Sequence, residues 1–203
     1  MKNNQLGRSM VEMLGVLAII GVLSAGALAG YSKAMFKHKV NQSIDIFQGV
    51  LQRLIELDQS NLGDDFVINN AEAQEQYGLI QNCQKVEGSA YGDSSCQLPI
   101  GYLDTDLYFY EGMLNGIVLV RFNDANSCIA FSSAPWDQVI PQDFLTGGDG
   151  VGFLTVADDM NVVYGYKDGV FENTWDVAKI AQECSICNDD LQLCYLELMI
   201  HVY

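Results

Sequence analysis

A run of twenty residues from Met10 to Ala29 contains a single ionisable side chain, that of Glu12. A helix of this length rises about 30 Å, which is the thickness of the hydrocarbon core of a bilayer. Its eleven large apolar side chains each favour insertion by about 0.3–0.6 kcal/mol, whereas a carboxylate costs roughly 3 kcal/mol at mid-helix and less near an end. The run therefore predicts a membrane-spanning helix, and the retained carboxylate indicates a functional site with a charged partner.

The residues at the start of this run form a motif. Gly7-Arg8-Ser9-Met10-Val11-Glu12-Met13 follows a short polar leader, Met1 to Leu6, and leads into the apolar run. This pattern resembles the type IV prepilin signature. The resemblance implies that a membrane peptidase cleaves between Gly7 and Arg8, that the new amino terminus of Arg8 is N-methylated, and that Glu12 neutralises the N-terminal ammonium of a neighbouring subunit. The sequence departs from the family at Arg8, because the first mature residue is usually apolar.

Two other interpretations of this segment remain open. A secretory signal peptide has a basic start, an apolar run and a small-residue cleavage site, which Lys2, Arg8 and Ala27-Leu28-Ala29 supply. A plain single-span anchor needs only the apolar run. Neither interpretation explains the five-residue spacing between Gly7 and Glu12.

Composition limits the rest of the chain. With 203 residues, 49% of them hydrophobic, the chain has room for one membrane segment and one globular domain. Residues 1–40 carry a net charge of +4 and the remainder a net charge of −20. Such an acidic domain repels phosphates, which excludes nucleic-acid binding. It also repels its own copies, so side-by-side packing needs screening, cations or the basic patch from Lys33 to Lys39.

The cysteines indicate an exported domain. All six follow the membrane segment, and an even number confined to that part is typical of an oxidising compartment. Positive-inside counting favours the opposite orientation, because three lysines follow the span and only Lys2 and Arg8 precede it. We give precedence to the cysteines and the leader, and expect the C-terminal domain outside the cytoplasm. The cysteines are Cys83, Cys96, Cys128, Cys184, Cys187 and Cys194.

The helix is expected to continue beyond the span to about Gln59. Apolar residues recur at steps of three and four along this second part, with polar residues opposite them, which predicts an amphipathic helix against a globular domain. The expected divisions are a leader at 1–7, a membrane or filament-core helix at 8–30, its amphipathic continuation at 31–60 and a globular head at 61–203. The stripe consists of Phe36, Val40, Ile44, Phe47, Leu51, Leu54 and Asp58, widened by Val50, Ile55 and Leu57.

Short elements alternate through the head, which predicts an α+β fold with antiparallel strands. The expected elements are a helix at 70–77 capped by Asn69 or Asn70, a hairpin of 107–110 and 116–122 turning at Asn115-Gly116, a helix at 127–134 capped within 124–126 and ended by Pro135, a hairpin of 153–156 and 162–166, a helix at 175–184 capped by Asn173 or Thr174, and a final strand at 191–202.

This order of elements resembles the globular domain of type IV pilins, and its late cysteines resemble those of type IVb-type pilins. Six cysteines allow 15 pairings. The favoured set joins Cys83 with Cys96, which enclose a Gly/Ser-rich loop, Cys128 with Cys184, and Cys187 with Cys194. The last two pairs can exchange partners in this prediction, because Cys184 and Cys187 lie one helical turn apart.

Other chemistry has weaker support. Zinc thiolate sites use Cys-x2-Cys pairs, and Cys184, Cys187, Cys194 and His201 have such a spacing, but an exported chain favours disulfides. Loop oxygens suit calcium, although loop acids are more often solvated, so no cofactor is expected. With His38 and His201 as the only histidines and no Gly-x-Ser-x-Gly or phosphate-binding glycine motif, an enzyme is not expected. The loop residues considered for calcium are Asp143, Asp149, Asp158, Asp159 and Asn161.

The resemblance implies a structural subunit, major or minor, of a type IV pilus, with a role in adhesion, motility or DNA uptake. Its partners would be copies of itself, other pilins, a prepilin peptidase and an inner-membrane assembly platform. It would begin as a single-pass inner-membrane protein and end in an extracellular filament. The alternatives are a pseudopilin of a type II secretion system and a membrane-anchored exported binding domain that never polymerises.

Overall fold

The computed structural model of the chain describes residues 6–60, 66–88, 92–110, 112–140, 151–156, 162–167, 170–188 and 194–202. The chain divides into two compact units, Met1–Lys39 and Val40–Tyr203. The expected calcium ligands, Asp143, Asp149, Asp158, Asp159 and Asn161, lie outside the described residues, as do most of the leader and the turn-forming residues 61–65.

Helix α1 (Leu6–Asp58) begins in the first unit and ends in the second. The predicted continuation of the membrane-span helix into an amphipathic helix is confirmed, because α1 runs for 53 residues without interruption. No proline occurs in it, so every position after the first turn is able to donate its backbone N–H to the helix.

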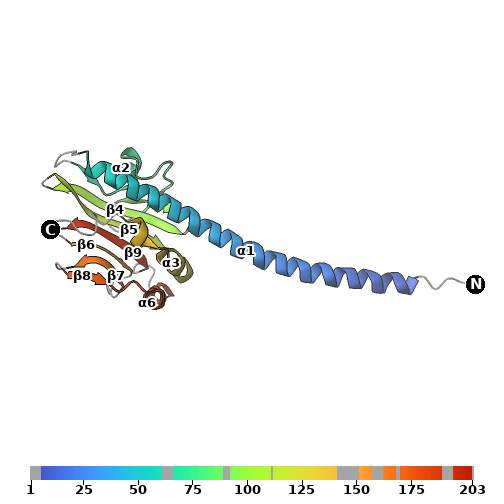
Figure 1. Cartoon of the computed structure of the whole chain (residues 1–203). Coiled ribbons are helices and arrows are strands. Elements are labelled where there is room, and N and C mark those ends of the chain that lie inside the picture. Colours follow the sequence, from blue (N-terminus) through green and yellow to red (C-terminus); the bar gives the residue numbers. More distant parts are fainter. Residues whose placement is uncertain are drawn as a thin grey trace, which may run out of the picture. The chain divides into compact units, whose positions relative to one another are not determined.

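The second unit combines the end of α1 with a nine-stranded antiparallel sheet in the described part of the chain. The strand order is β2-β3-β4-β5-β9-β6-β7-β8, and β1 pairs with β4 (Figure 1). The long N-terminal helix, antiparallel sheet and disulfides confirm the predicted α+β fold class. The elements after α1 are β1 (Val67–Ile68), α2 (Ala71–Gln76), β2 (Lys85–Glu87), β3 (Ser94–Leu98), β4 (Gly101–Tyr110), β5 (Met113–Phe122), α3 (Ala125–Ser132), α4 (Trp136–Val139), β6 (Val151–Val156), β7 (Val163–Lys167), β8 (Val170–Asn173), α6 (Val177–Glu183), the 3-10 helix η1 (Cys184–Asn188) and β9 (Tyr195–Val202).

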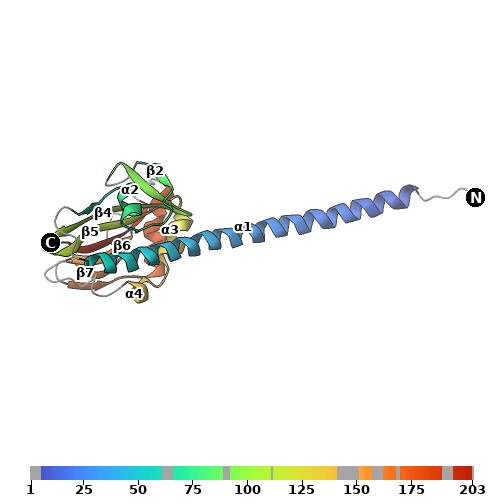
Figure 2. The same ribbon diagram turned by 90° about the horizontal axis from the view of Figure 1, so that it is seen from above.

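The end of α1 lies across one face of the sheet (Figures 1 and 2). Its apolar stripe forms the centre of the core, where the Phe47 ring lies 5.7 Å from that of Phe131 in α3 and 5.2 Å from that of Trp136 in α4. The stripe ends at Asp58, whose carboxylate accepts the backbone N–H of Leu114 at 2.9 Å. The buried members of the stripe are Val40, Phe47, Val50, Leu51, Leu54 and Leu57.

The predicted turn of the first hairpin was wrong. Asn115 and Gly116 lie inside β5, which pairs with β4 from Met113 onward. Gly116 has a φ of 130°, and a Cβ there would lie 1.9 Å from the carbonyl oxygen of Asp106. Glycine at this position therefore permits the close approach of β4, and it does not mark a turn.

The helix caps were predicted in part. Asn70 caps α2 and Asp124 caps α3, each accepting a backbone N–H with its side chain. The expected cap of α6 at Asn173 or Thr174 was wrong, because Asp176 caps that helix. The residues before it form β8, and the Thr174 hydroxyl oxygen accepts the N–H of Val163 at 2.9 Å. Because Thr174 is bonded to β7, the helix starts later in the sequence than expected.

A buried charge lies in the middle of the sheet. Asp104 in β4 is fully buried, and its carboxylate accepts the Nε–H of Arg121 at 2.5 Å and the hydroxyl of Ser95. Arg121 also donates to the carbonyl of Gly88 at 3.0 Å. These bonds join β3, β4, β5 and the loop after β2. The Arg121 side chain is 22% exposed.

Replacing Arg121 with methionine is expected to lower the free energy of unfolding by about 3 kcal/mol, because it leaves the Asp104 carboxylate buried without its cation. Chemical denaturation of the purified chain measures this loss. The matched control is Lys85→Met, whose ion pair with Glu72 is exposed and whose loss should leave the free energy of unfolding nearly unchanged. Equal losses of unfolding free energy in the two variants would contradict the role of Arg121 as the cation that neutralises the buried Asp104.

Candidate assembly interface

The residues of the predicted N-terminal site all lie in α1. Gly7 and Arg8 fall in its first turn and Glu12 follows one turn later. Glu12 is exposed, and the side chains that the structure describes form no ion pair with it. Its carboxylate therefore remains available to a charge from outside the described part of the chain.

The apolar run of α1 has no cover within its own unit. One helix in the described residues is long and apolar enough to cross a membrane, and none of its apolar window is buried inside the structure. Burying a large aliphatic side chain is worth about 1.5–3 kcal/mol, so this surface requires lipid or other helices around it. Its large side chains, each more than half exposed, are Met10, Val11, Met13, Leu14, Val16, Leu17, Ile19, Ile20, Val22, Leu23, Leu28 and Tyr31.

Four glycines leave gaps along this surface. A Cβ added at Gly15, Gly21, Gly26 or Gly30 would meet no atom within 4 Å. Among the described residues, no contact therefore requires glycine at these positions. Small residues allow membrane helices to approach one another closely, so these positions suit contacts with a second helix.

A basic segment follows the apolar run. Lys33, Lys37 and Lys39 are exposed, and among the described residues none of them takes part in an ion pair. Lys33 lies only four residues beyond Ala29, which places its ammonium within reach of the headgroup level of a bilayer.

The cysteines form three disulfides in the favoured pairing: Cys83 with Cys96, Cys128 with Cys184, and Cys187 with Cys194. The bond from α3 to the end of α6 closes 56 residues of chain. The Sγ atoms of Cys128, Cys187 and Cys194 lie within 4.8 Å of one another, so the two late disulfides are neighbours. The residues proposed for zinc include three cysteines whose sulfurs are used in these bonds.

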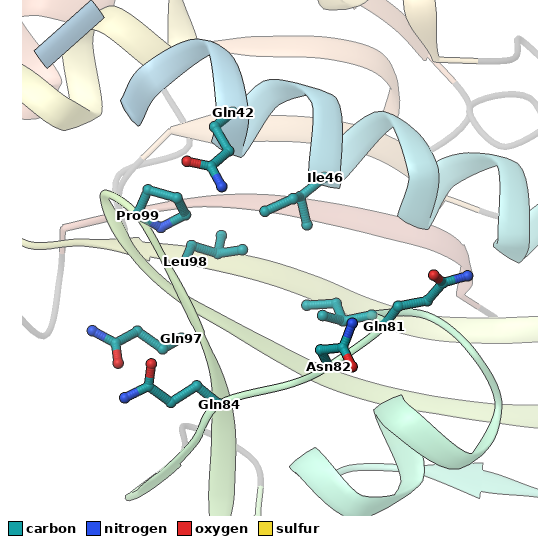
Figure 3. Close-up of a pocket in the computed structure, with 9 residues that line it drawn as sticks. Gln42, Ile46, Gln81, Asn82, Gln84, Gln97, Leu98 and Pro99 are labelled. Carbon is teal, nitrogen blue, oxygen red and sulfur yellow. The ribbon is translucent and has the colours of Figure 1, made fainter. Parts of the chain in front are cut away.

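Sequence patterns did not indicate a pocket in the second unit. It has a volume of about 350 Å³ and lies between α1, the segment before β2 and the end of β3 (Figure 3). Its polar lining consists of carboxamides, three of which, Gln81, Asn82 and Gln84, surround Cys83 in the sequence. This cluster of carboxamides beside Cys83 was the one feature of the sequence that could have indicated the pocket, because the other parts of the lining lie in separate segments of the chain.

No family model and no curated protein sequence matches the chain. Among solved structures, the chain is similar to the crystal structure of a type IV b pilin from Salmonella typhi. The two are 13% identical, with a TM-score of 0.45 over 80% of this chain and 99% of the pilin chain. At that TM-score the likeness adds no weight to what the chain's own residues indicate.

Proposed function

We propose that this chain is a pilin-like subunit that is inserted in the inner membrane and then built into a type IV filament. The observation that carries the proposal is the uncovered apolar surface of α1 with one carboxylate, Glu12, five residues after Gly7. The disulfide-linked second unit supports it, because a subunit exposed on a filament needs a head that stays folded outside the cell.

In the proposed assembly, the apolar parts of α1 from many copies pack together as the filament core. Glu12 then meets the amino terminus of an adjacent copy. Each charge is costly in hydrocarbon alone, and pairing relieves both costs. Only one axial offset between two helices brings the groups together, so the pair also sets the register of neighbouring subunits.

Processing is part of the same proposal. Cleavage after Gly7 by a prepilin peptidase creates the positive amino terminus on Arg8, which is then N-methylated. The uncleaved chain places no terminal ammonium four residues from Glu12. Other pilins and an inner-membrane assembly platform complete the set of partners, and adhesion, motility and DNA uptake are the roles that such a filament serves.

The two alternative functions also begin with membrane insertion, but they differ from the filament subunit in what the inserted chain then does. A pseudopilin of a type II secretion system uses the same cleavage and helix packing. An anchored binding domain that never polymerises has no need of Glu12. Loss of assembly on replacing Glu12 therefore separates the filament proposal from the anchor, although both require membrane insertion.

Mass spectrometry of the protein purified from its membrane is expected to find Arg8 as the first residue, with one added methyl group. The N-terminal amine of Arg8 stays protonated after methylation and keeps its attraction to Glu12. A Gly7→Ala variant serves as the control for cleavage and should retain the leader. An amino terminus at Gly30 would instead support the signal-peptide interpretation and contradict the proposal.

A further inference from the structure

The pocket in the second unit has walls from three separate parts of the chain. Gln42 and Ile46 come from α1, Gln81, Asn82 and Gln84 from the segment before β2, and Gln97 from β3 (Figure 3). Ile80 and Leu98 also line it and are buried, and Pro99 lies beside Gln42. The pocket therefore combines apolar residues with a polar rim of carboxamides.

The rim consists of five exposed carboxamide side chains. No hydrogen bond within the described residues involves the side chains of Gln42, Gln81, Asn82, Gln84 or Gln97. A carboxamide offers two N–H donors and a carbonyl acceptor with two lone pairs. Five such groups around one cavity can therefore satisfy a ligand whose polar groups both donate and accept.

Two links hold the walls of the pocket together. The Cys83–Cys96 disulfide joins the segment before β2 to β3, and the backbone N–H of Gln97 donates to the carbonyl of Gln84 at 2.9 Å. These two links fix the side-by-side arrangement of Gln84 and Gln97 seen in Figure 3. A preformed site loses less conformational entropy when a ligand binds, because its walls are already ordered.

The pocket is neutral in a strongly acidic chain. The chain has a net charge of −16, yet none of the lining residues is titratable. The cation nearest in sequence, Lys85, is paired with Glu72 at 2.8 Å. The hydrogen bond from Lys85 is the main reason that the pKa of the Glu72 carboxyl is lowered. The surroundings thus favour an uncharged ligand.

We propose that this pocket binds a neutral saccharide unit. Sugar hydroxyls both donate and accept hydrogen bonds, as the exposed carboxamides do, and the C–H face of a pyranose ring can pack on the half-buried Ile46 and Pro99. The volume of about 350 Å³ is within the range of small-molecule sites, about 300–1,000 Å³. This inference is independent of polymerisation, because all the lining residues belong to the second unit.

Saturation-transfer NMR tests the proposal on the full chain in zwitterionic, sugar-free detergent micelles. The probes are the methyl glycosides of glucose, galactose, N-acetylglucosamine and N-acetylgalactosamine, with sialic acid and an uncharged blocked tripeptide for comparison. At least one neutral glycoside should bind, and sialic acid should bind more weakly. Saturation transfer to the tripeptide alone, or to sialic acid as strongly as to the best neutral sugar, would overturn the proposal.

Variants locate the binding site. Gln42→Leu/Gln97→Leu removes two rim carboxamides and should weaken binding by about tenfold. Gln84→Glu keeps the shape of the side chain but adds a charge, and should weaken binding as well. The control is Gln52→Leu, an exposed position of α1 outside the pocket. Unchanged binding in both rim variants would overturn the proposal, and far-UV circular dichroism checks that each variant is folded.

Discussion

Replacing Glu12 with valine or glutamine is expected to abolish filament formation and to leave membrane insertion intact. Valine removes the carboxylate and makes the apolar run more hydrophobic, so insertion improves. In both variants the amino terminus of each adjacent subunit is left in hydrocarbon without a counter-ion. Breaking a buried charge pair in this way costs about 3–5 kcal/mol per contact, and the cost recurs at every subunit of the filament.

The measurement is the amount of fibre sheared from the cell surface, compared with the amount of subunit in the membrane fraction. Glu75→Gln is the matched control, because Glu75 is an exposed carboxylate of the second unit and should leave fibre yield unchanged. Disulfide mapping of the membrane-bound variant confirms that its head is folded. Wild-type fibre yield from either Glu12 variant would contradict the proposed pairing.

Removing the Cys128–Cys184 disulfide is expected to lower the free energy of unfolding by about 4 kcal/mol. The bond closes 56 residues of chain, and in the chain-entropy model the stabilisation increases with the length of the closed loop. The Cys187–Cys194 bond closes only 7 residues and should contribute about 2 kcal/mol. The double alanine variants make the comparison without leaving free thiols or buried hydroxyls.

Denaturant unfolding monitored by tryptophan fluorescence measures both losses, because Trp136 is fully buried in the core. Alanine must replace both cysteines of a pair. A lone Cys184→Ala variant frees the Cys128 thiol, whose sulfur lies within 4.8 Å of both Cys187 and Cys194. Peptide mapping of that variant should find exchanged disulfides. Equal losses from the two double variants would contradict the loop-length argument.

Local patterns in the sequence predicted α1, α2 and α3, whereas α4 was not predicted and the start of α6 was placed too early. The apolar run and the stripe through Phe47 and Leu54 predicted α1 across its whole length, because helical periodicity is set by residues three and four apart. The caps Asn70 and Asp124 were predicted for the same reason, since a cap bonds to residues two or three positions away. The favoured disulfide set is the one the structure shows, although the sequence left an exchange of partners between the last two pairs open.

The errors occurred where an adjacent strand, beyond the reach of helix and turn signals, decides the local structure. Gly116 resembles a turn residue, but its place in β5 follows from the approach of Asp106 in β4. Thr174 resembles a helix cap, but its hydroxyl pairs with Val163 in β7. In both places, pairing with a neighbouring strand decided the structure against the local sequence signal.

By itself, the sequence determined that this chain begins with a long helix, apolar at first and amphipathic afterwards, and that Glu12 is the lone charge in its apolar part. Only the tertiary structure decided which separate groups come together, such as Arg121 with Asp104 and the five carboxamides that line one pocket. The physical reason is that helix periodicity depends on neighbours along the chain, whereas strand pairing and pocket walls depend on how separate segments pack in space.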